Sequence, residues 1–229
     1  MMYSLLLQIK TVQEATQMVA RPAVITLSLW DLIVKGGVIM IPLLLLSFLA
    51  VFFFFERLIA IKKASKDNVH FMSTIREMIS NLKIDSAKAI CQTTNTPVSR
   101  MVEKGIGRIG KPISEIERSV ESAGKFEVSK LEKNLKILGI VAGIAPMLGF
   151  VGTIMGVIKI FYNISLADNI SIGIIAGGLY EKMITSASGL IIGILAYAGY
   201  HYLNILLDKV IFRMEDTAIE FIDLLQKEA

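Results

Sequence analysis

Residues 137–158 read ILGIVAGIAPMLGFVGTIMGVI, which is a run of 22 residues without a charged side chain. Two further uncharged runs, residues 36–55 and 183–207, hold 20 and 25 residues. Only 19% of the 229 residues are charged, against roughly 25% in soluble domains. Crossing the hydrocarbon core of a bilayer takes about 20 apolar residues of helix. The sequence therefore predicts an all-α membrane protein with three transmembrane helices, and not a cytosolic enzyme.

The charges between these runs predict the orientation. Residues 62–136 carry 15 Lys and Arg against 9 Asp and Glu, with basic residues close to both adjoining spans. An excess of Lys and Arg beside a span marks the cytoplasmic side. We therefore expect the amino terminus outside and the carboxyl terminus inside. The net charge of +4 then reflects topology and not nucleic-acid binding, because the basic residues alternate with acids along helices.

The expected organisation follows the chain back and forth across the membrane. It comprises an outer-side amphipathic helix and lead-in (1–31), a first span (32–61), a cytoplasmic helical region (62–136), a second span (137–161), a short outer-side loop (162–177), a third span (178–207) and a cytoplasmic helical tail (208–229). Apolar residues at helical spacing continue from spans two and three into the charged segments, so both spans should extend into a cytoplasmic helical bundle.

The helix that enters span two is expected to begin far outside the membrane. Pro112 suits a first helical position, and Ser114 with Glu117 fits a capping box there. The apolar spacing then runs into span two without a proline, which predicts one continuous helix of about 45 residues.

Spans two and three are rich in small residues, whereas span one is rich in Leu and Phe and has no polar face. Small residues allow helices to approach closely in lipid, and Pro146 is expected to kink span two. Span one is therefore expected to face lipid, while spans two and three are expected to line an internal space. The candidate helix-packing residues are Gly139, Gly143, Pro146, Gly149, Gly152, Gly156, Gly189 and Gly193.

Hydroxyl groups are the main polar side chains in these two spans. Thr153 lies in span two, and Thr185 lies next to Ser186 in span three. Such hydroxyls either join helices or line a polar path, and both roles stay open here. Glu181 lies at the outer edge of span three, where either Lys159 or water would be its partner. Because no acid lies deep in any span, a proton relay would need a carboxylate from another chain.

Two kinds of ligand site are not expected. His70 and His201 have no Cys or His neighbours at ligand spacing, so we predict no metal site and no cofactor. The segment from Gly105 to Lys111 partly matches a phosphate-binding loop. Pro112 follows it where the motif needs a Ser or Thr for magnesium, so we expect no nucleotide site.

Two stretches carry a resemblance to a known family. Residues 145–156, APMLGFVGTIMG, and residues 178–190, GLYEKMITSASGL, resemble the span-two and span-three signatures of the ExbB/TolQ/MotA proton-channel family. The three-span layout with a large loop after span one looks like the ExbB/TolQ branch, since the MotA branch has four spans.

The resemblance implies a proton-driven motor subunit of the bacterial inner membrane, with a periplasmic amino terminus and a cytoplasmic carboxyl terminus. It implies a homopentamer whose central pore holds the single transmembrane helices of an ExbD- or TolR-like partner. That partner carries the proton-accepting Asp. Work would pass to an outer-membrane process through a TonB- or TolA-like protein.

The resemblance also assigns residues to the proton pathway. The family's pore threonine of span two falls on Thr153, and its acid at the head of span three falls on Glu181. Its span-three pore threonine falls on Ser186, which keeps the hydroxyl, and Thr185 beside it could share the role.

Two other functions stay open. A structural membrane scaffold without ion conduction would tolerate apolar residues at Thr153, Ser186 and Glu181. A solute transporter is disfavoured, because the sequence shows no inverted repeat and three spans are few.

Overall fold

The computed structural model describes residues 36–65, 70–166 and 172–228, so the expected outer-side helix of residues 1–31 lies outside it. These ranges are helical and contain no strand, which confirms the all-α class. The helices are α3 (Met40–Ala64), α4 (Phe71–Ser80), α5 (Ile84–Thr94), α6 (Pro97–Ile106), α7 (Ile113–Glu132), α8 (Leu135–Ser165) and α9 (Ile172–Glu228).

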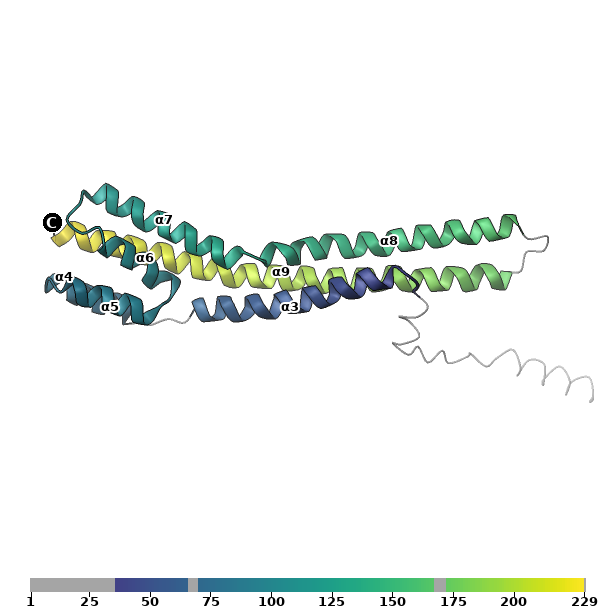
Figure 1. The fold of residues 1–229 in the computed structure, drawn as a ribbon, viewed down its shortest axis with the longest axis horizontal. Helices are drawn as coiled ribbons and strands as arrows, with labels where there is room; N and C mark the ends of the chain where they lie inside the picture. Colours follow the sequence, from purple (N-terminus) through teal and green to yellow (C-terminus); the bar gives the residue numbers. More distant parts are fainter. Residues whose placement is uncertain (1–35, 66–69, 167–171, 229) are drawn as a thin grey trace, which may run out of the picture. The chain divides into compact units, whose positions relative to one another are not determined.

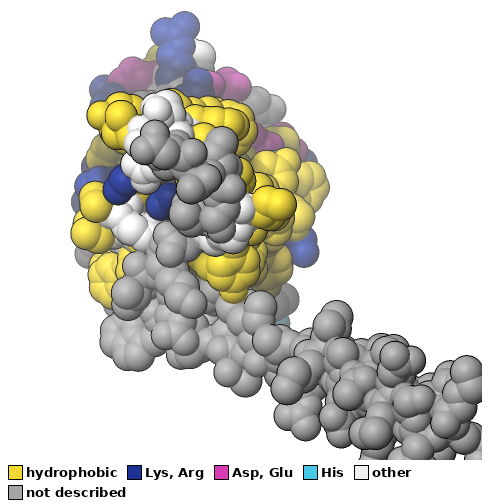
Figure 2. All heavy atoms as spheres, turned by 90° about the vertical axis from the view of Figure 1, so that its right-hand side faces the viewer, with side chains coloured by type: hydrophobic (Ala, Val, Ile, Leu, Met, Phe, Trp, Pro, Cys, Tyr) yellow, Lys and Arg dark blue, Asp and Glu magenta, His cyan; other side chains and the backbone are white. Residues whose placement is uncertain are grey.

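Three helical stretches of the described chain are long and apolar enough to cross a membrane, and they lie in α3, in the α7–α8 segment and in α9. Large apolar side chains on α3 point away from the rest of the chain: Phe48 is 71% exposed and Phe52 is 54% exposed. Figure 2 shows that hydrophobic side chains cover much of the surface at the end where α8 and α9 meet. The chain is therefore a multi-pass membrane protein.

Helix α9 is the element against which most of the other described helices pack, while α5 packs against α4 and α6. It has 57 residues. Helix α8 lies along its first half, α3 along its middle, and α4 to α7 beside its second half (Figure 1). Its apolar side chains recur every three or four residues, and Leu203, Val210 and Phe221 are almost fully buried. Span three therefore continues into a helical bundle, as its periodicity predicts.

The expected continuous helix into span two is wrong, because α7 ends at Glu132 and α8 begins at Leu135. Between them, Asn134 has a left-handed backbone with φ of 65°, which asparagine adopts more readily than most residues. The expected capping box at Ser114 is also wrong, since α7 has no side-chain cap. The structure places a capping box at the start of α6 instead.

Helix α3 supplies the groups that hold the break between α7 and α8. Arg57 is 8% exposed, and its Nη1 donates hydrogen bonds to the carbonyl oxygens of Lys130 (3.1 Å) and Leu131 (3.3 Å). The last carbonyls of a helix have no partner within the helix, so Arg57 stabilises the end of α7. The side-chain amide of Asn134 donates to Glu56 Oε2 at 3.3 Å.

An ion-pair cluster joins α6 to α7. The carboxylate of Glu127 is buried and accepts hydrogen bonds from Arg100 Nη2 (2.5 Å) and Lys130 Nζ (2.7 Å). Burial raises the pKa of Glu127, but the bonds from these two cations outweigh it and hold the pKa below the ordinary 4.5. Glu127 is therefore charged in the folded protein at neutral pH.

Candidate functional site

The hydroxyl of Thr153 lies at the contact between α8 and α9. Its Oγ1 is 3.2 Å from the carbonyl oxygen of Gly149, one turn back in α8, and 3.2 Å from the carbonyl oxygen of Lys182 in α9. One hydroxyl proton is shared between these two acceptors. The side chain is half-buried, so Thr153 joins the two helices at the edge of their contact.

The hydroxyl of Thr185 lies at almost the same level on α9 but faces the interior. Thr185 is 1% exposed, and its Oγ1 donates to the carbonyl oxygen of Gly36 at 3.0 Å. A Cβ built on Gly152 of α8 would lie 2.8 Å from Thr185 Cγ2. The structure therefore brings α8, α9 and the lead-in to α3 together at Thr185.

Ser186 lies where the backbones of α8 and α9 come closest. Its side chain is half-buried, and a Cβ built on Gly149 would lie 3.1 Å from the carbonyl oxygen of Ser186. A Cβ on Gly189 would lie 2.6 Å from the carbonyl oxygen of Ala145. Real Cβ atoms essentially never lie within 3.0 Å of another atom in this way, so the packing at Gly189 depends on glycine.

On either side of this closest approach, a proline or a lysine side chain fills the space beside a glycine. A Cβ on Gly193 would lie 2.4 Å from Cγ of Pro146, and the side chain of Lys182 occupies the space beside Gly156. Helix α8 is continuous through Pro146. Lys182 is a residue that sequence reasoning missed, and its signal was a lone cation at the start of an uncharged span.

The glycine pair nearest the start of α8 behaves differently. A Cβ on Gly139 would make ordinary contact with the ring of Tyr200, at 3.5 Å, and a Cβ on Gly143 would meet nothing within 4 Å. Gly143 is exposed. This side of α8 therefore leaves room for a close approach by another chain.

Glu181 belongs to α9, but its side chain lies outside what the structure describes. Lys159 is exposed near the end of α8. The pairing of Glu181 with Lys159 therefore stays a prediction.

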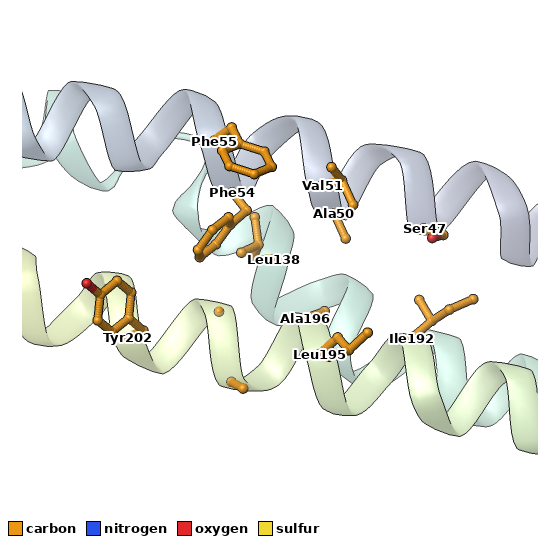
Figure 3. A pocket seen from close by; sticks show the side chains of 12 residues that line it. Ser47, Ala50, Val51, Phe54, Phe55, Leu138, Ile192, Leu195, Ala196 and Tyr202 are labelled. Carbon is orange, nitrogen blue, oxygen red and sulfur yellow. The ribbon is translucent and has the colours of Figure 1, made fainter.

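An apolar cavity of about 370 Å³ lies between α3 and α9. In Figure 3, Phe54 and Val51 from α3 and Leu195 and Ala196 from α9 border it, with Leu138 of α8 between them. Its few hydroxyl-bearing residues include Tyr202. Among the described residues that line the cavity, Tyr202 is the one with an ionisable group, so we place no proton chemistry there.

Comparison with known proteins gives one family. Residues 93–216 match the model of the MotA/TolQ/ExbB proton channel family. An ExbB-like biopolymer transport protein of Synechocystis sp. is 29% identical over 184 residues, which cover 76% of this chain and 70% of that protein. The biopolymer transport protein ExbB of Xanthomonas campestris pv. campestris is 25% identical, over 64% of this chain and 57% of that protein. The Tol-Pal system protein TolQ of Haemophilus influenzae is 28% identical, over 49% of each chain.

Proposed function

Because this chain belongs to the MotA/TolQ/ExbB proton channel family, we propose that it is the channel-forming subunit of a motor driven by the proton-motive force. It forms a pentamer in the bacterial inner membrane, around the transmembrane helices of an ExbD- or TolR-like partner. Proton flow through the partner's Asp energises an outer-membrane process through a TonB- or TolA-like protein. Each proton makes about 2.3 kcal/mol available per 100 mV.

The observation that carries this proposal is the hydroxyl of Thr153 at the edge of the α8–α9 contact. It is half-buried, so one side of it remains open to a chain packed against α8 and α9. Gly143, on the same helix, leaves space for that chain. In the proposed pathway, Thr153 and Ser186 lie beside the partner's carboxylate, with Thr185 next to them, and Glu181 lies at the outer entry.

The proposed orientation follows the positive-inside rule. The basic 62–136 segment and the end of α9 lie in the cytoplasm, and the amino terminus lies in the periplasm.

A structural scaffold is the second candidate, and one observation favours it. The hydroxyls of Thr153 and Thr185 both have acceptors within the chain, which is what helix-joining residues need. A scaffold would use these hydroxyls for packing alone.

The test compares Thr153→Ser with Thr153→Val. The chain is purified with an ExbD- or TolR-like single-span protein, reconstituted in liposomes, and assayed for proton uptake under an imposed potential. Native mass spectrometry checks the oligomer of each variant. Thr153→Ser should retain proton uptake, and Thr153→Val should lower it at least tenfold with the oligomer intact, as expected when a proton pathway loses a hydroxyl.

Unchanged proton uptake by Thr153→Val in an intact complex would support the scaffold. Loss of the oligomer in that variant would show that the hydroxyl acts in packing, which also contradicts the proposed role. Glu181→Gln adds an independent arm, since it removes the charge of the proposed entry point and keeps the size of the side chain.

A further inference from the structure

A groove of about 850 Å³ runs between α7 and the last third of α9, far from the glycine contacts of α8. On α9 its lining residues run from Ile211 to Asp223 with helical spacing, which corresponds to about 18 Å of helix. On α7 they run from Glu117 to Glu132 with the same spacing. Helix α7 lies beside the last part of α9 (Figure 1), and the groove lies between the two stripes of lining residues.

The described part of the chain leaves the apolar part of the groove uncovered. Met214 forms part of its base and is 2% exposed, whereas Ile219 on its wall is 63% exposed. At Gly124 the α7 backbone carries no side chain into the groove. An exposed apolar strip of this kind, bordered by polar residues, is typical of an interaction surface.

The border of the groove is acidic. Five of its lining residues are acids and one, Lys125, is basic. Lys125 pairs with Glu121 at 2.6 Å, and Glu132 lies 3.8 Å from Lys136. Among the described residues, the structure gives no ion pair to the three remaining acids, which are Glu117, Glu215 and Asp223. A bound segment that carries cations would therefore find unneutralised carboxylates on both sides.

The position of the groove indicates where such a segment would come from. Its Glu132 end is also the end of α7, two residues before Asn134 and the start of the membrane helix α8. A partner chain that leaves the membrane beside the start of α8 would meet the Glu132 end of the groove before the rest of it. By the positive-inside rule, the cytoplasmic flank of such a chain is rich in Lys and Arg.

We infer that this groove binds the cationic, amphipathic juxtamembrane segment of a membrane-spanning partner. Its apolar residues contact Met214 and Ile219, and its Lys and Arg side chains lie against Glu117, Glu215 and Asp223. The inference rests on the cytoplasmic orientation and the single-span partner of the proposed function, and it does not depend on proton flow.

The experiment measures binding of a probe peptide to the full chain in nanodiscs of phosphatidylcholine. The probe is a fluorescein-labelled, 14-residue helix of Lys and Leu with Leu along one face, and empty nanodiscs give the lipid background. A groove variant combines Glu117→Gln, Glu215→Gln and Asp223→Asn. A control variant combines Glu77→Gln, Asp85→Asn and Glu103→Gln, which removes the same charge outside the groove.

The groove variant should weaken binding about tenfold or more, while the control variant should change it less than about threefold. A probe with Ser in place of Leu should also bind about tenfold more weakly, because it lacks the apolar face. Ile219→Ser should weaken the Leu probe, and Phe126→Ser, which alters an equally exposed residue outside the groove, should not.

Equal losses in the groove and control variants would overturn the inference, because binding would then follow net charge alone. Equal binding of the Leu and Ser probes would overturn it as well. A change of oligomeric mass in the groove variant would show that a second copy occupies the groove, which contradicts a partner segment. Peptide binding in the groove together with an absence of proton uptake in liposomes would contradict the proposed function and still support the proposed binding to the groove.

Discussion

Substitution of Gly189 by alanine tests the contact that sets the α8–α9 distance. The new Cβ would lie 2.6 Å from the carbonyl oxygen of Ala145 and 2.9 Å from Cα of Gly149. Both are backbone atoms, so no side chain can rotate away. Ordinary contact begins at 3.4 Å, so the helices must separate by about 0.8 Å (3.4 − 2.6) at this level.

Overpacking of this kind costs about 1–3 kcal/mol, and the gain in helix propensity from glycine to alanine returns up to about 1 kcal/mol. Two backbone atoms within 3.0 Å of the new Cβ place the cost near the upper end of that range, so we expect Gly189→Ala to lower the free energy of unfolding by about 2 kcal/mol. Gly143→Ala is the matched control in α8, since its Cβ would meet nothing within 4 Å. It should leave the folded chain as stable as before, or slightly more stable.

Pulse proteolysis of the purified chain in mixed micelles with increasing SDS gives the folded fraction of each variant. A Gly189→Ala protein as stable as the wild type would refute the contact. So would a Gly143→Ala chain that unfolds as readily as Gly189→Ala. If Gly143→Ala leaves the chain folded but removes the oligomer, the open side of α8 is where another chain packs.

Two further predictions concern the charged half of the molecule. Arg57→Gln should increase hydrogen exchange at residues 130–136, because the α7 carbonyls lose hydrogen bonds to a charged donor that contribute roughly 1.5–3 kcal/mol each. Arg118→Gln, at an exposed site on α7, should leave exchange there unchanged. Glu127 has a lowered pKa, so its stabilising effect is present above about pH 4.5 and is lost as the pH falls through the lowered value. In Glu127→Gln, the free energy of unfolding measured by chemical denaturation should therefore fall less steeply as the pH is lowered. Glu77→Gln should leave that pH dependence as it is in the wild type.

The sequence alone determined the class of molecule and the presence of three long apolar helices. Uncharged runs of 20 or more residues are a local property of the chain, and a bilayer requires that length whatever the helices pack against. Helical spacing likewise predicted that α9 continues past the membrane. The same local information located Thr153, Thr185 and the glycines in their helices.

Only the tertiary structure decided which of these residues meet. Gly189 and Gly143 look alike in the sequence, but one lies against a backbone and the other lies in open space, because the rotation of each helix is set by its neighbours. The contacts of Thr153 and Thr185 were equally hidden, since each has an acceptor carbonyl in another segment of the chain.

The break at Asn134 shows why periodicity failed for α7 and α8. The apolar spacing passes through it unchanged, and the groups that hold the break come from Glu56 and Arg57, more than 70 residues earlier in the chain. The groove beside α7 was equally hidden, because its two lining stripes are far apart in the sequence and come together only in the fold. A pattern along one helix specifies which face is apolar, and packing between helices decides whether that face is covered.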